Sequence, residues 1–220
     1  QGLYPTGSTF KPITATAALE GGLITPNTII NDTGALRLDT VTFKNAGGSA
    51  FGPIALRQAL QVSSDVFFYN LGLDAEQAGG NVIQGWAENL GLGERTGIDL
   101  PEEVPGLVPT PEWRNQEFAE DTDPSSPGGE AVVLEKGETV DRKWSAGDGV
   151  NLSVGQGDLQ VDPLQLAVAY AAIANGGDVV RPHVAQQVED SSGRVVQEIR
   201  PAPRRHVQIA PEHQQAILEG

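Results

Sequence analysis

The chain has 220 residues, of which 39% are hydrophobic, and a formal net charge of −15 at pH 7. This acidity argues against a nucleic-acid partner, which favours a basic face, and no apolar run approaches the length of a membrane span. Cysteine is absent and the three histidines are scattered. We therefore expect no disulfide, no metal site and no cofactor.

Apolar spacing and glycine breaks predict the elements of the first half of the chain. Helices are expected over residues 8–19, 54–71 and 76–90, each followed by a polar or glycine-containing segment. The segment between the first two helices looks irregular, with short strands near residues 28–30 and 41–43.

The second half begins with a change in composition. Proline, glycine and acidic residues dominate residues 101–149, and we expect residues 115–145 to form an acidic, mobile surface loop. A helix is predicted over residues 162–175, because Pro163 stands in its first turn and two glycines end it. Two strand-like runs joined by DSSG predict a hairpin over residues 183–199, and a last helix begins at residue 211.

Ser8 and Lys11 form the first candidate site, at the start of the first predicted helix. Residues three apart share a helix face, so the amine is placed to reach the hydroxyl oxygen. A serine hydroxyl needs such a neighbouring base, and burial beside Phe10, Pro12 and Ile13 would lower the pKa of Lys11. The Ser8 N–H is a candidate oxyanion donor. An ordinary helix surface is the alternative interpretation of a single Ser-x-x-Lys pair.

A second polar cluster, Ser63-Ser64-Asp65, falls inside the predicted helix 54–71. Serine and aspartate disfavour helix interiors, because their side chains compete for backbone hydrogen bonds. Two interpretations stay open at this point. The cluster is either a solvent-facing strip or kink, or a cleft wall whose hydroxyl relays a proton to and from Lys11.

Taken together, these segments resemble the transpeptidase domain of class B penicillin-binding proteins of the elongation type, the group of penicillin-binding protein 2. The stretch PTGSTFK, which contains Ser8 and Lys11, resembles the family's first motif. The stretch SSD resembles the second motif in its Ser-x-Asp form, with Ser63 and Asp65 in place. The later GQG, PLQL and ANGG stretches resemble the segment that precedes the third motif.

The resemblance implies an α/β fold of the α+β type, with a helical subdomain, an antiparallel sheet and the active site between them. We expect residues 1–220 to be part of such a transpeptidase domain: the helical subdomain and some sheet strands. The family's Lys-Thr-Gly strand and its upstream membrane anchor are not among these residues. The resemblance therefore places the full protein on the extracytoplasmic face of the bacterial membrane, and the fragment alone is expected to be inactive.

The activity that the resemblance implies is peptidoglycan D,D-transpeptidation through a serine acyl-enzyme. Ser8 would be the nucleophile, Lys11 its base and Ser63 a proton shuttle, while Asp65 would orient Lys11 or the substrate amide. Stem peptides and β-lactam antibiotics are the implied ligands, and a wall-synthesis glycosyltransferase is the implied partner. Two alternatives remain: a serine β-lactamase of the same fold, and a non-catalytic β-lactam sensor or structural partner.

Overall fold

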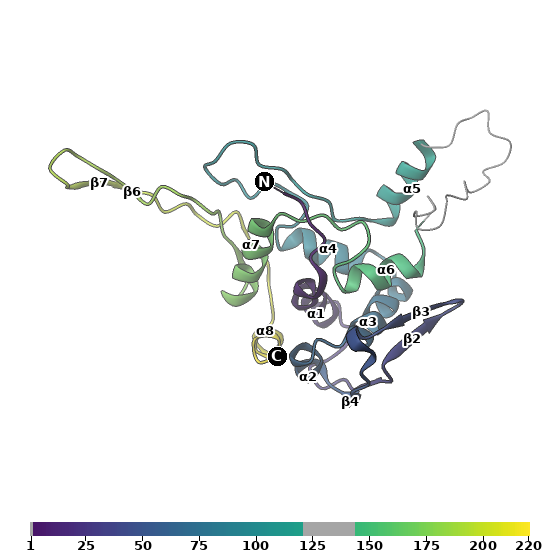
Figure 1. Cartoon of the computed structure of the whole chain (residues 1–220). Coiled ribbons are helices and arrows are strands. Elements are labelled where there is room, and N and C mark those ends of the chain that lie inside the picture. The colour runs from purple at the N-terminus through teal and green to yellow at the C-terminus, as the bar shows by residue number, and fades with distance from the viewer. Residues whose placement is uncertain (1, 121–143) are drawn as a thin grey trace.

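The computed structural model describes residues 2–120 and 144–220 (Figure 1). The longer helices of these residues surround one apolar core, and short strands lie at the periphery. The helices are η1 (Gly7–Phe10), α1 (Lys11–Glu20), η2 (Ala46–Gly48), α2 (Leu56–Gln61), α3 (Asp65–Ala78), α4 (Val82–Asn89), α5 (Pro111–Glu120), α6 (Ala146–Ser153), α7 (Pro163–Ala174) and α8 (Pro211–Leu218).

The described strands form four antiparallel pairs. The pairs are β1 (Ile30–Asp32) with β4 (Gly52–Ile54), β2 (Ala35–Leu38) with β3 (Val41–Lys44), β5 (Asp178–Val179) with β8 (Arg205–His206), and β6 (Gln187–Glu189) with β7 (Val195–Glu198). No described helix has the length and apolar character needed to cross a bilayer.

Helix α1 is the centre of the core. All seven residues from Ile13 to Leu19 are buried, and α3, α4 and α8 pack around them (Figure 1). The small side chains of Ala15, Ala17 and Ala18 allow these neighbours to approach closely. The residues at the N-terminus of α1 thus belong to a helix that is buried over most of its length.

Helices α3 and α6 are in direct backbone contact. A Cβ atom on Gly72 of α3 would lie 2.8 Å from the carbonyl oxygen of Gly149 on α6. A Cβ on Gly149 would in turn collide with the side chain of Glu76. The two glycines therefore set how closely α6 approaches the helix that begins at the second polar cluster.

The predicted helix 54–71 is wrong as a single element. The chain breaks at residues 62–64 and forms two helices, α2 and α3, with Ser63 at φ 54° between them. Ser64 is the N-cap of α3 and accepts a hydrogen bond from Phe67 N. The cluster thus stands at a helix start, where serine and aspartate are favoured, and not in a helix interior.

The predicted helix 76–90 also has the wrong start. Helix α3 continues to Ala78, and α4 begins only at Val82, because Gly79 and Gly80 both take positive φ angles and separate the two helices. Within the expected acidic loop, residues 115–120 belong to α5 instead, and α6 begins at Ala146. Residues 121–143 of that loop lie outside the described residues.

Three elements of the second half agree with the sequence expectations, whereas the strand expected near residues 28–30 forms as β1 at Ile30–Asp32. Helix α7 and the β6–β7 hairpin form where predicted, and α8 begins at Pro211. The hairpin projects away from the helical body (Figure 1). The chain therefore combines a helical subdomain with short antiparallel strands, as we expected from the family resemblance.

Candidate active site

Ser8 lies in the 3-10 turn η1, immediately before α1, and not in the α-helix itself. Two neighbouring segments hold this turn. Gly7 N donates to Gly155 O over 2.8 Å, and Tyr170 Oη of α7 donates to Thr9 O over 2.8 Å. The turn that carries Ser8 is therefore held by Gly155 of the GQG stretch and by Tyr170 of α7, the helix that begins with the PLQL stretch.

Gly155 explains why the GQG stretch needs its first glycine. Its φ angle is +70°, and a Cβ atom there would lie 2.3 Å from both Gly7 O and Thr6 Oγ1. Only glycine adopts this backbone conformation freely and lets the two loops touch. The packing fixes the position of η1 relative to α6.

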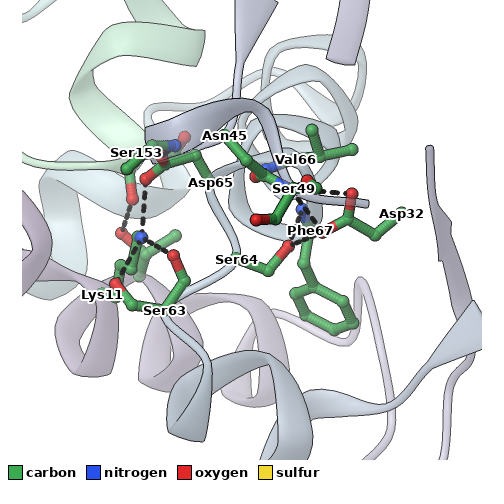
Figure 2. Close-up of polar contacts among 12 residues, drawn as sticks. Lys11, Asp32, Asn45, Ser49, Ser63, Ser64, Asp65, Val66, Phe67 and Ser153 are labelled. Carbon is green, nitrogen blue, oxygen red and sulfur yellow. Dashed lines mark hydrogen bonds and ion pairs between the residues drawn. The ribbon is translucent and has the colours of Figure 1, made fainter. Parts of the chain in front are cut away.

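Lys11 is 1% exposed, and three oxygen atoms surround its amine (Figure 2). The Nζ atom donates to Ser63 O over 2.7 Å, to Ser63 Oγ over 2.9 Å and to Asp65 Oδ1 over 2.7 Å. Burial lowers the pKa of Lys11, and the hydrogen bond and charge of Asp65 partly oppose this fall. The direction agrees with the sequence expectation.

Of the predicted apolar neighbours of Lys11, Phe10 and Ile13 are buried in the core. The ring of Phe68, which sequence reasoning missed, lies 5.6 Å from Lys11 Nζ. Phe68 belongs to α3 and follows Asp65 by three residues, so the helix that provides the ion-pair partner also provides part of the apolar wall.

Ser8 is exposed beside a cavity of about 290 Å³ that Lys11, Ser63 and Tyr170 also line. Leu60 of α2 and Ile217 of α8 make its walls mainly apolar. No hydrogen bond joins Ser8 to Lys11 in the described part of the chain, because the amine is turned toward Ser63 and Asp65. The structure thus brings Lys11, Ser63 and Asp65 into contact and places Ser8 on the same cavity.

Asp65 connects the Lys11 cluster to the rest of the fold. Its Oδ1 atom pairs with Lys11, and its Oδ2 atom accepts a hydrogen bond from Ala46 N over 3.0 Å. Burial and the charge of Asp65 raise the pKa of the neighbouring Tyr69 to about 12. Tyr69 therefore stays neutral over the physiological range.

A second buried network, centred on Asp32, was missed at the sequence level. Asp32 accepts hydrogen bonds from Gly34 N, from Asn45 Nδ2 and from Ser64 Oγ (Figure 2). The only local signal is the NDTG stretch, which is typical of a turn. Its hydrogen bonds to Asn45 and Ser64 join residues far apart in the sequence, so no local sequence pattern predicts them.

The sequence matches the penicillin binding protein transpeptidase domain family over residues 1–220. The chain belongs to this family. Both motif pairs lie within the matched residues: Ser8, Lys11 and Ser63 line one cavity, and Asp65 contacts the Lys11 amine.

Known relatives agree with this assignment. The peptidoglycan D,D-transpeptidase MrdA of Acinetobacter baumannii is 36% identical over 186 residues, which are 84% of this chain and 24% of that protein. The chain thus spans about a quarter of the length of this curated relative.

Solved structures extend the likeness to the fold. The structure of Pseudomonas aeruginosa PBP2 in complex with WCK 5153 matches with a TM-score of 0.77 and 27% identity, over 99% of this chain and 43% of that one. A peptidoglycan synthase complex that coordinates polymerization and crosslinking matches with a TM-score of 0.75 and 26% identity, over 99% of this chain and 32% of that one. The partial α+β transpeptidase fold expected from the sequence is confirmed.

Proposed function

We propose that this transpeptidase domain, within its full protein, cross-links peptidoglycan stem peptides through an acyl-enzyme on Ser8. The observation that carries the proposal is the buried Lys11 amine, held by Ser63 and Asp65 on the cavity that Ser8 also lines. The MrdA relative, named a peptidoglycan D,D-transpeptidase, supports the same reaction class.

The acylation step needs a base for the Ser8 proton. A lysine serves only in its neutral form, and burial of Lys11 lowers its pKa in that direction. Neutral Lys11 takes the proton from Ser8 Oγ, which attacks the carbonyl of the penultimate D-Ala. The backbone N–H of Ser8 then serves as one donor to the developing oxyanion.

Ser63 completes the proton path in this proposal. Its hydroxyl accepts a hydrogen bond from Lys11 Nζ, so it is placed to pass the proton on to the departing D-Ala amine. In the second half-reaction the amine of a neighbouring stem peptide attacks the Ser8 ester, loses its proton along the reverse path and restores free Ser8. One peptide bond is broken and one is formed over the whole cycle, so no cofactor is consumed.

Asp65 orients the base. Its Oδ1 atom lies 2.7 Å from Lys11 Nζ, and its charge opposes the effect of burial on the pKa of Lys11. The balance of the two effects sets how much neutral amine is present near neutral pH. Asp65 therefore tunes the base as well as holding it.

The ligands and partners of the full protein follow from the same proposal. A β-lactam resembles the D-Ala-D-Ala end and would trap Ser8 as a stable ester. The likeness to a synthase complex that couples polymerization and crosslinking favours a wall-synthesis glycosyltransferase as partner. Because its substrate is peptidoglycan, the domain would work on the extracytoplasmic face, held there by an upstream anchor.

Labelled penicillin applied to the full-length protein tests the proposal. We expect a persistent adduct that disappears in Ser8→Ala and is unchanged in the matched control Ser192→Ala, whose serine stands on the β6–β7 hairpin. Failure to form the adduct, or an undiminished adduct in Ser8→Ala, contradicts the proposal. Rapid release of hydrolysed penicillin would instead indicate a β-lactamase.

A further inference from the structure

A buried carboxylate lies behind the Lys11 cluster and has no part in the proposed reaction. Asp32, at the end of β1, is 1% exposed. Gly34 N donates to it over 2.7 Å, and Asn45 Nδ2 lies 2.8 Å from each of its oxygens. Burying a carboxylate is unfavourable unless donors satisfy its oxygens, so this convergence of donors has to be accounted for.

The α2–α3 junction faces Lys11 on one side and Asp32 on the other. Ser63 and Asp65 contact the amine, whereas Ser64 between them turns away and donates to Asp32 Oδ2 (Figure 2). The same Ser64 oxygen accepts from Phe67 N at the start of α3. Asp32 therefore fixes the residue that lies between the two partners of Lys11.

Asn45 and Ala46 also link Asp32 to Asp65, through the peptide unit that joins Asn45 to Ala46. Asn45 donates to Asp32 and accepts from Val66 N over 2.8 Å. The next residue, Ala46, donates its N–H to Asp65 Oδ2. Displacement of the Asn45 side chain would thus move the backbone donor that holds the second oxygen of Asp65.

The junction needs support from outside because its backbone conformation is unfavourable. Ser63 has a φ angle of 54°, in the left-handed region that residues other than glycine adopt at a cost. In this conformation both its carbonyl and its hydroxyl oxygen contact Lys11 Nζ. Such a conformation persists only where surrounding contacts enforce it.

We infer that Asp32 is a positioning residue of the Lys11 site, which acts through Ser64 and Asn45 to hold Ser63 and Asp65 against the lysine amine. The expected effect of Asp32 on the rate of acylation rests on the proposed function. Its expected effect on the pKa of Lys11 does not. Among the described residues, Asp65 is the charged group in contact with Lys11, and Tyr69 is the other titratable group that interacts with Asp65.

Asp32→Asn in the full-length protein tests this role, because it replaces an acceptor oxygen with an N–H donor where Asn45 and Ser64 already donate. We expect the rate constant of acylation by labelled penicillin to fall by about tenfold to a hundredfold. Water that enters a loosened junction relieves the burial that lowers the pKa of Lys11, so the pH profile of acylation moves to higher pH. Ser64→Ala removes the bond to Asp32 and the capping bond from Phe67 N but leaves the Asp32–Asn45 contact, so it should produce a smaller change of the same sign.

Asp162→Asn is the matched control. Asp162 is also buried, and it caps α7 by accepting a hydrogen bond from Leu164 N, a role that asparagine fills equally well. Acylation at the wild-type rate and with an unshifted profile in both Asp32→Asn and Ser64→Ala would overturn the inference. So would an equal loss of rate in Asp162→Asn. If Asp32→Asn does not fold, Ser64→Ala decides.

A lysine-selective NMR titration without penicillin separates this inference from the proposed function. It follows the Lys11 amine directly and needs no acylation. If the wild-type protein forms no adduct, the proposed function fails, but the titration still decides the role of Asp32. A pKa of Lys11 that rises in Asp32→Asn supports the inference, and an unchanged pKa overturns it.

Discussion

Two aspartates accept several hydrogen bonds each, one at the end of β1 beside the α2–α3 junction and one on the β6–β7 hairpin. Asp32 is enclosed by β1, the loop after β3 and the start of α3. Asp190 accepts from Ser192 and Arg194 in an exposed turn. Water can replace every hydrogen-bond partner of Asp190 but none of those of Asp32. Loss of the carboxylate should therefore cost far more stability at Asp32 than at Asp190.

The ion pairs of the two regions differ in the same way. Lys11 and Asp65 have side chains that are 2% and 15% exposed, whereas Arg194 is 81% exposed where it meets Asp190. An exposed pair of this kind contributes little, because solvent screens it and two long side chains lose freedom. In the buried pair, burial lowers the pKa of Lys11 and Asp65 partly opposes that fall.

The largest effect is expected for Lys11→Met, which keeps the length and apolar stem of the side chain but removes the base. Acylation of Ser8 by labelled penicillin should fall about a thousandfold. In the unsubstituted protein the rate should rise with pH until the lowered pKa of Lys11 is passed, because only the neutral amine accepts a proton. Stopped-flow acylation across pH measures both.

Arg194→Met on the hairpin is the control for that experiment. It removes a cation from the exposed ion pair and should leave both the rate and the pH profile unchanged. A comparable loss of rate in the two variants would contradict the contrast between the regions.

The next effect concerns stability. Asp32→Ala leaves the side chains of Asn45 and Ser64 without their buried acceptor and should lower the free energy of unfolding by about 3 kcal/mol. Asp190→Ala should leave the urea unfolding midpoint unchanged, because water satisfies the freed donors. Equal shifts in the two midpoints would show that burial does not make the difference.

A smaller effect is expected from one added methyl group. Gly155→Ala should lower the free energy of unfolding by about 2 kcal/mol and slow acylation, because its Cβ would collide with the backbone of the Ser8 turn. Gly193 on the hairpin has a similar φ angle, +83°, with open space around it. Gly193→Ala should therefore show only the backbone cost of about 1 kcal/mol and no change in acylation. Thermal melts and labelling of the two variants compare them.

The sequence predicts well those elements whose signals are local. Pro163 near the start of α7 and Gly176 after its end are such signals, and the helix lies within one residue of its predicted bounds. The break between α2 and α3 has no glycine or proline to announce it. Ser63 takes a glycine-like conformation because Lys11 and the Asp32 network hold its neighbours, and no local pattern encodes that.

The residues of the candidate site also fall into those that the sequence pointed to and those that it did not. The family resemblance implied that Ser63 and Asp65 act together with Lys11, and the structure places both in contact with the Lys11 amine. Asp32 and Asn45 were missed, because their partners are distant in sequence and a polar turn between short strands looks ordinary. The lysine bonds to Ser63 and not to Ser8, which only the packed structure discloses.

Ser8 and Ser63 both line the cavity beside Lys11, so both are considered as the acylated residue. Peptide mapping of the penicillin adduct by mass spectrometry identifies which of the two is acylated. Ser63 Oγ lies 2.9 Å from Lys11 Nζ, whereas Ser8 is the exposed hydroxyl of the braced turn beside the same cavity. The full-length protein should carry its adduct on the peptide containing Ser8. An adduct on the peptide containing Ser63 would contradict the assignment of nucleophile and proton shuttle.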